Sequence, residues 1–153
     1  MKKEQVLILC TANSARSQMG EGLLRSMAGE RMDVFSAGTL ATRVNPLAIE
    51  AMQEIGIDIS GHTSKSQDQF LQKEFDFVIT VCDNANKNCP RFPGSGVHLH
   101  WAFPDPAAAE GGHDEQLAAF RQVRDAIQAR LRTWLDEEKD TTDYSSLGLQ
   151  LSL

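Results

Sequence analysis

Short apolar runs alternate with segments of helical periodicity through the first half of this chain. Residues 6–9 form a continuous apolar run that predicts a buried strand, and residues 17–28 carry apolar side chains at helical spacing. Residues 34–38 predict a second short strand. Asn45 and Pro46 then supply an N-cap and a first-turn proline for another helix. The first half therefore predicts two strand–helix units.

The second half adds two strands and one long helix. Residues 64–72 predict a short helix, residues 75–81 the strongest strand of the chain, and residues 97–101 a fourth, shorter strand. A final helix is predicted from about residue 114 to about residue 135. Its apolar residues form a single stripe: Leu117, Phe120, Val123, Ile127, Leu131, Trp134 and Leu135.

This order of elements predicts an α/β fold with a four-stranded, mostly parallel sheet and helices on both faces. No linker rich in proline, glycine or serine divides the chain, so we expect a single domain over residues 1–138. Residues 136–138 are acidic, and the helix dipole disfavours negative charge at a helix C-terminus, so we expect fraying there. Residues 139–153 form a tail whose alternating leucines fit either a half-buried strand or a mobile terminus.

Composition narrows the classes of partner and compartment. The chain has 153 residues and a formal net charge of −6, with no basic run longer than Lys2 and Lys3. We therefore expect neither nucleic acid nor a membrane surface as a partner. No apolar stretch approaches the ~20 residues of a membrane span, and no signal-type segment precedes the first strand, which predicts a cytoplasmic protein. Three cysteines are an odd number, which argues against a framework of structural disulfides and leaves reactive, metal-binding or inert roles open.

The segment that follows the first predicted strand carries the clearest chemistry. It holds a thiol, Cys10, and a guanidinium, Arg16, between the end of a strand and the start of a helix. Backbone N–H groups of such a loop converge on one point, and the helix N-terminus adds positive potential, so we expect a tetrahedral oxyanion above a nucleophilic Cys10 thiolate. An inert buried cysteine is the alternative. The predicted oxyanion-binding residues are Thr11, Ala12, Asn13, Ser14, Ala15, Arg16 and Ser17.

Two further segments follow strands at the same edge of the predicted sheet, where ligands bind in such folds. Cys82 follows the third strand, and six residues separate it from Cys89, so the two thiols could form a redox pair or be inert. No cysteine or histidine spacing typical of zinc occurs, and we predict no metal site. Asp105 lies between two prolines shortly after the fourth strand, where it could donate a proton or simply shape a turn.

The oxyanion loop, the two later cysteines and residues 100–106 together resemble the thioredoxin-coupled arsenate reductases, which have the low-molecular-weight tyrosine phosphatase fold. The resemblance covers roughly residues 5–135. It implies that Cys10 attacks arsenate, held by Arg16 and the loop, while Asp105 protonates the departing oxygen. It further implies that Cys82 attacks Cys10 as arsenite leaves, that Cys89 resolves this bridge, and that thioredoxin reduces the final disulfide. The activity implied is reduction of arsenate in arsenic detoxification.

The resemblance also raises the question of a bound cation. Some members bind potassium beside the loop through groups that match Asn13, Glu21 and Ser36. An acidic ligand expected near Thr63 is replaced here by Lys65, whose ammonium could supply the charge of the metal. We therefore expect no cofactor and no potassium site.

Two other functions use the same residues. A low-molecular-weight tyrosine phosphatase would use Cys10, Arg16 and Asp105 on a phosphate ester. Such phosphatases usually have a second loop cysteine, where this chain has Ala15, and aromatic residues after the acid, where it has two alanines. The other alternative is a non-catalytic oxyanion or redox sensor, which would not turn over.

Overall fold

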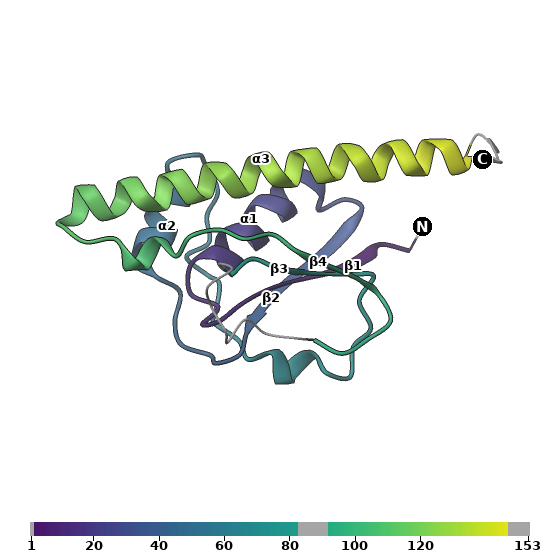
Figure 1. Ribbon diagram of the computed structural model, residues 1–153, viewed down its shortest axis with the longest axis horizontal. Coiled ribbons are helices and arrows are strands. Elements are labelled where there is room, and N and C mark those ends of the chain that lie inside the picture. The colour runs from purple at the N-terminus through teal and green to yellow at the C-terminus, as the bar shows by residue number, and fades with distance from the viewer. Residues whose placement is uncertain (1, 83–91, 147–153) are drawn as a thin grey trace.

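The computed structural model describes residues 2–82 and 92–146, and Figure 1 shows how the elements follow one another. The chain order of strands and helices is the predicted one. The elements are β1 (Glu4–Cys10), α1 (Arg16–Ala28), β2 (Met32–Gly38), α2 (Pro46–Gln53), the 3-10 helix η1 (Gln67–Phe70), β3 (Phe77–Thr80), β4 (Val97–His100), the 3-10 helix η2 (Pro106–Ala108) and α3 (His113–Ser146).

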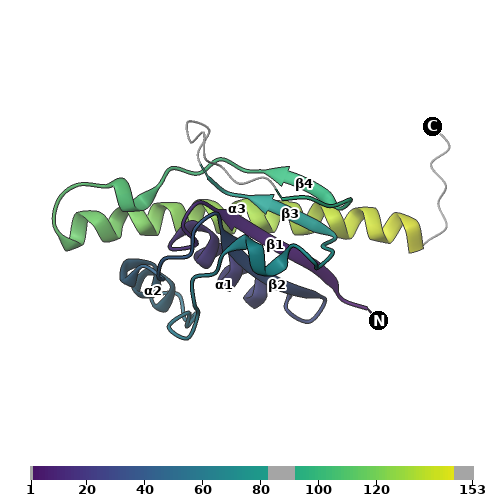
Figure 2. The ribbon, with the colours of Figure 1, turned by 90° about the horizontal axis from the view of Figure 1, so that it is seen from below.

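All four strands form one parallel sheet in the order β2-β1-β3-β4, as Figure 2 shows from the side opposite α3. The predicted fold class is therefore confirmed. β1 lies in the centre and pairs with β2 along its whole length, with Cys10 opposite Gly38. On its other side β1 pairs with β3, with Leu9 opposite Thr80. Both neighbours end beside Cys10, so the carboxyl edge of the sheet gathers three connecting segments.

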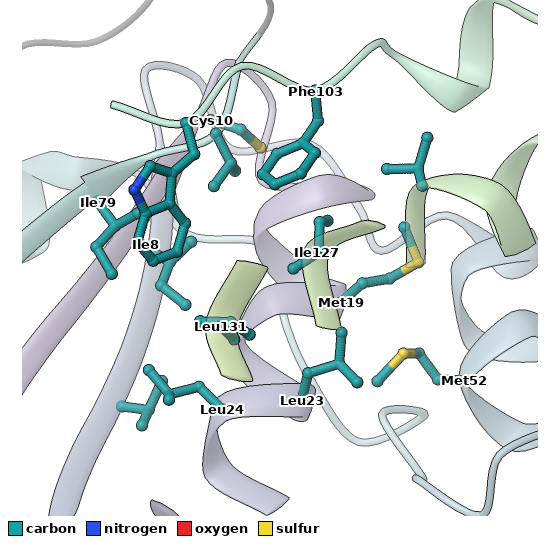
Figure 3. Packing of buried hydrophobic residues seen from close by; sticks show 14 of the residues in the cluster. Ile8, Cys10, Met19, Leu23, Leu24, Met52, Ile79, Phe103, Ile127 and Leu131 are labelled. Atoms are coloured by element: carbon teal, nitrogen blue, oxygen red, sulfur yellow. The ribbon is translucent and has the colours of Figure 1, made fainter. Parts of the chain in front are cut away.

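The two faces of the sheet are covered unequally. Alternation along β1 sends Val6 and Ile8 into one apolar cluster and Leu7 and Leu9 into another. The first cluster contains the buried faces of α1, α2 and α3, and Figure 3 shows Cys10 and Phe103 at the same end of it. The second is closed by aromatic side chains of β2, of η1 and of the segments before β3 and β4: Phe35, Phe70, Phe75 and Phe92. The α-helices therefore cover one face and the short η1 the other.

Two elements differ in length from the prediction. α3 continues to Ser146, so the expected fraying after residue 135 is wrong. No glycine or proline occurs between His113 and Ser146, and an established helix continues through residues that do not break it. The predicted helix over residues 64–72 is shortened to η1. A backbone hydrogen bond holds Lys65 beside Gly38 (2.9 Å), and Ser66 forms an isolated β-bridge with the same glycine.

No helix in the described part of the chain is long and apolar enough to cross a membrane.

Candidate active site

The loop between β1 and α1 lies where the sequence predicts it. Cys10 ends the central strand and Arg16 begins the helix, so residues 11–15 turn above the carboxyl edge of the sheet. Asn13 has a φ of 48°, the left-handed conformation that asparagine tolerates better than most residues. Gly38 of β2 lies against the loop so closely that an added Cβ would be 2.6 Å from the carbonyl oxygen of Thr11. Sequence and packing therefore define one loop conformation.

Cys10 is a buried free cysteine whose sulfur lies 2.8 Å from the Oγ atom of Ser17. The Nδ2 group of Asn13 donates a hydrogen bond to that same Oγ at 2.8 Å. Because Ser17 already accepts this hydrogen bond, its own hydroxyl hydrogen is available for the sulfur. A hydroxyl that donates to sulfur favours the charged thiolate over the neutral thiol. The contact is therefore consistent with the nucleophilic role predicted for Cys10.

Asn13 connects the loop to segments that are distant in sequence. Its Nδ2 also donates to Ser36 on β2 at 2.9 Å. Its Oδ1 accepts from Nε2 of Gln18 at 2.8 Å and from the backbone N–H of Lys65 at 2.8 Å. All four side-chain hydrogen-bonding positions of this fully buried amide are thus used. Asn13 therefore links the loop both to β2 and to the segment before η1.

Gln18 and His62 extend this network and were not predicted from the sequence. The Nε2 group of Gln18 also donates to the carbonyl oxygen of Thr63 at 3.0 Å, while its Oε1 lies 3.0 Å from Nδ1 of His62. Burial lowers the pKa of His62, which favours the neutral ring. Arg25 lies 3.3 Å from the other ring nitrogen, which must then accept, so Nδ1 donates to Gln18. The spacing of the histidines carried no signal of this contact.

Arg16 is buried and faces the segment after β4. Its Nη1 donates to the carbonyl oxygen of Phe103 at 3.0 Å, and only 6% of the residue is exposed. Within the described chain Arg16 forms no ion pair with a carboxylate. A buried guanidinium without an acidic partner is suited to binding an anion. The predicted place of Arg16 in an oxyanion site is therefore consistent with its surroundings.

Asp105 belongs to the same segment that Arg16 contacts. It is exposed and caps η2, with its Oδ1 accepting from the backbone N–H of Ala107 at 3.0 Å. Because Phe103 is held by Arg16, Asp105 lies two positions away from a residue fixed at the site. The turn role considered for this residue is present, and its exposed carboxyl group leaves a proton-donor role open.

Cys82 lies near the same edge of the sheet as Cys10. It follows β3 closely and is fully buried. The strand pairing continues beyond β3, because the N–H of Val81 donates to the carbonyl oxygen of Leu9 at 2.9 Å. Cys82 is therefore the residue after Val81, which pairs with the end of β1. Cys82 forms a disulfide bond. Cys89, the third predicted thiol, lies outside the described residues.

Glu21 lies behind the loop and is a further buried charge. One carboxylate oxygen accepts a hydrogen bond from Ser36 at 2.5 Å, and the other forms an ion pair with Arg25 at 2.9 Å. Only 5% of the residue is exposed. Lys65 lies on its other side, with Nζ 3.9 Å from Oε1. Glu21, Ser36 and Lys65, which the comparison of this chain with potassium-binding members singled out, thus lie together beside Asn13.

Comparison with known proteins agrees with this geometry. The family model described as low molecular weight phosphotyrosine protein phosphatase matches residues 5–143. An arsenate reductase of Halalkalibacterium halodurans is 48% identical over 139 residues, covering 91% of this chain and 100% of that protein. A solved arsenate reductase in the phosphate binding state has a TM-score of 0.71 and 31% identity, covering 88% of this chain and 98% of its own.

The name of a third similar protein includes its reductant. The thioredoxin-dependent arsenate reductase of Corynebacterium glutamicum has a TM-score of 0.68 and 29% identity, over 91% of this chain and 63% of its own. Family match, sequence identity and fold thus point in one direction. The chain belongs to the low molecular weight phosphotyrosine protein phosphatase family and, within it, to the arsenate reductases.

Proposed function

We propose that this protein reduces arsenate to arsenite in arsenic detoxification. Three cysteines react in turn, and thioredoxin then reduces the final disulfide. The position of Cys10 carries the proposal: it is a free thiol, hydrogen-bonded to Ser17, at the mouth of a loop that Arg16 closes. Relatives at up to 48% identity are named arsenate reductases, which supports the choice of substrate. Arsenate is a tetrahedral oxyanion of the kind that such a loop binds.

In the first step the Cys10 thiolate attacks arsenic(V). Arg16 and the loop N–H groups hold the remaining oxygens and stabilise their charge. Asp105 gives its proton to a hydroxyl of arsenate, which leaves as water, and a bond between sulfur and arsenic forms. The exposed position of Asp105 on the segment that Arg16 contacts supports this assignment. Arsenic is still pentavalent in this adduct.

Reduction takes place in the second step. The thiolate of Cys82 attacks the sulfur of Cys10, the sulfur–arsenic bond breaks, and its electron pair stays on arsenic, which leaves as arsenite. Cys89 then attacks Cys82, and Cys10 departs as a thiolate. Two thiols have thus become one disulfide and have supplied the two electrons. The place of Cys82 beside the end of β1, and its participation in a disulfide, support this order.

Thioredoxin is the proposed reductant of that last disulfide. Its use by a structurally similar arsenate reductase supports the proposal. Reduction by a dithiol protein requires a reducing compartment, so we also propose a cytoplasmic location. Glutaredoxin with glutathione is the competing reductant, and the two are separated by supplying each alone.

The deciding experiment couples arsenate reduction to NADPH through thioredoxin and thioredoxin reductase. The wild-type protein should consume one NADPH for each arsenate until arsenate is exhausted. Cys89→Ser should release about one arsenite per protein and then stop, because the bridge to Cys10 cannot be resolved. Cys10→Ser should release none. A wild-type protein that stops after one equivalent would instead be the oxyanion or redox sensor.

Phosphate ester hydrolysis is the second candidate, because the family model is that of phosphotyrosine phosphatases. Ala107 is exposed in η2 beside Asp105 and offers no aromatic surface to a phenyl ring. We therefore expect only weak hydrolysis of p-nitrophenyl phosphate. Cys89→Ser separates the two activities, since hydrolysis requires Cys10 and is indifferent to Cys89. Hydrolysis that exceeds arsenate reduction would make the protein a phosphatase.

A further inference from the structure

A buried carboxylate lies directly behind the catalytic loop. Glu21 is 5% exposed; one of its oxygens accepts a hydrogen bond from Ser36, and the other forms an ion pair with Arg25. A buried carboxylate is costly unless a positive charge compensates it. The side chain of Arg25 is 48% exposed, so water screens its charge in part. A second, less exposed cation is therefore needed on the other side of Glu21.

Lys65 supplies that cation. Its side chain is 20% exposed, and Nζ lies 3.9 Å from Oε1 of Glu21. Nζ also donates to the carbonyl oxygen of Thr63 at 2.7 Å, which fixes its position. Burial lowers the pKa of Lys65, and Glu21 opposes this by raising it. Glu21 thus favours the charged form of the Lys65 amine.

The backbone of Lys65 is hydrogen-bonded to Asn13 of the loop and to Gly38 of β2. Its N–H donates to Oδ1 of Asn13 at 2.8 Å, and its carbonyl oxygen accepts from Gly38 at 2.9 Å. Asn13 in turn donates to the Ser17 oxygen that contacts Cys10. One residue therefore connects the charge of Glu21 to the hydrogen bond at the nucleophile.

The oxygens of Asn13, Glu21 and Thr63 are not available to bind a monovalent metal ion as well. Oδ1 of Asn13 already accepts two hydrogen bonds, one from Gln18 and one from Lys65, which uses both its lone pairs. Both oxygens of Glu21 are engaged, and the Thr63 carbonyl accepts from Nζ of Lys65 and from Gln18. A further cation would also meet the repulsion of the Lys65 ammonium at close range.

We propose that the Lys65 ammonium is an internal counter-cation that holds the catalytic loop through Glu21 and Asn13, in place of a bound potassium ion. Lys65 is a positioning residue, since it reaches Cys10 only through Asn13 and Ser17. Two consequences follow from this role. The wild-type protein does not respond to potassium, and removal of the Lys65 side chain creates a space that a small external cation can fill.

The test compares salts of equal ionic strength. Wild type should have the same melting temperature and the same rate of Cys10 alkylation in potassium chloride, ammonium chloride and choline chloride. Lys65→Ala in choline chloride should react at Cys10 about tenfold more slowly, as is typical when a supporting contact of a reactive group is removed. Potassium or ammonium should restore most of that rate and raise its melting temperature. Choline is too large to enter the space.

Three variants make the result specific to charge. Lys65→Met fills the space without charge, so it should be slow in every salt, whereas Lys65→Arg should be fast in every salt. Lys3→Ala removes an ammonium that is 43% exposed near the start of β1, at the other end of the sheet, and should behave as wild type. The inference is overturned if wild type responds to potassium, if Lys65→Ala matches wild type in choline, or if no small cation rescues it.

The inference deepens the proposed function but can fail separately from it. Melting temperature and alkylation of Cys10 are measured without arsenate. A protein that reduces no arsenate, yet whose Lys65→Ala variant is rescued by potassium, would refute the reductase proposal and leave the counter-cation in place. Rapid arsenate reduction, together with a Lys65→Ala variant that no small cation rescues, would refute the counter-cation and leave the reductase proposal in place.

Discussion

The sulfur of Cys10 lies 2.8 Å from the hydroxyl oxygen of Ser17, which itself accepts a hydrogen bond from Asn13. The two residues belong to the end of a strand and the first turn of a helix, so the contact depends on the loop between them. Because the Ser17 oxygen already accepts from Asn13, its hydroxyl hydrogen is available to the Cys10 sulfur. The first prediction tests this contact directly.

Ser17→Ala should slow the alkylation of Cys10 by iodoacetamide at neutral pH about tenfold, because a hydrogen bond to a charged group is worth about 1.5–3 kcal/mol. Ser26→Ala, on an exposed part of the same helix, is the control and should react as wild type. The labelled cysteine is identified by peptide mass. Equal rates for Ser17→Ala and wild type would mean that Ser17 does not stabilise the thiolate.

Gly38→Ala should displace the loop. The new Cβ would lie 2.6 Å from the carbonyl oxygen of Thr11 and 2.7 Å from the backbone nitrogen of Asn13, and neither backbone atom can move without the loop. Displacements of about 1 Å can cost 100-fold in rate, so we expect a loss of about that size in kcat/KM for arsenate. Gly61→Ala is the matched control, since no atom lies within 4 Å of its Cβ. Native activity in Gly38→Ala would contradict the close approach of β2 to the loop.

Asp105→Asn separates proton donation from turn formation. Asparagine keeps an oxygen that can accept from the N–H of Ala107, so η2 should be preserved. Without the acidic proton, single-turnover release of arsenite should fall about 100-fold, with little change in arsenate binding. Glu110→Gln, an exposed carboxylate further along the same connection, should have no effect. A fall of equal size in both variants would argue for a general charge effect.

The hydrogen bond between His113 of α3 and Glu50 of α2 should make the free energy of unfolding depend on pH. Hydrogen bonds to Glu50 and Asp114 raise the pKa of His113 above its ordinary value. The folded state therefore holds this proton more tightly than the unfolded chain. The resulting stability is fully present below about pH 6.5, the unfolded pKa, and is lost as pH rises through the folded pKa.

His113→Gln should accordingly lower the melting temperature at about pH 6, and the difference from wild type should shrink towards about pH 9. His98→Gln is the control, because a nitrogen of its ring faces the carbonyl oxygen of Gly94 at 3.4 Å instead of a carboxylate. A difference that stays constant over this range would mean that the His113 contact acts through packing alone.

The elements and the loop could be predicted from the sequence because both are local. A strand, a loop and a helix N-terminus are contiguous over residues 4–28, so residue types alone indicated where N–H groups, thiol and guanidinium would meet. Alternating strands and helices likewise predicted the parallel sheet. The predicted end of α3 was wrong for another reason: the unfavourable charge after residue 135 is a small effect beside the absence of any helix-breaking residue before Gly148.

What the tertiary structure decided is how distant segments share buried polar groups. Gln18 and His62 are far apart in sequence, and neither carries a spacing signal, yet they meet beside Asn13. Lys65 meets Glu21 in the same way. Such partners are selected by the requirement that every buried donor and acceptor be satisfied, which depends on which segments pack together. The sequence by itself therefore indicated Cys10 as the candidate nucleophile, whereas the network that holds its loop exists only once the sheet has brought residues 13, 36 and 65 into contact.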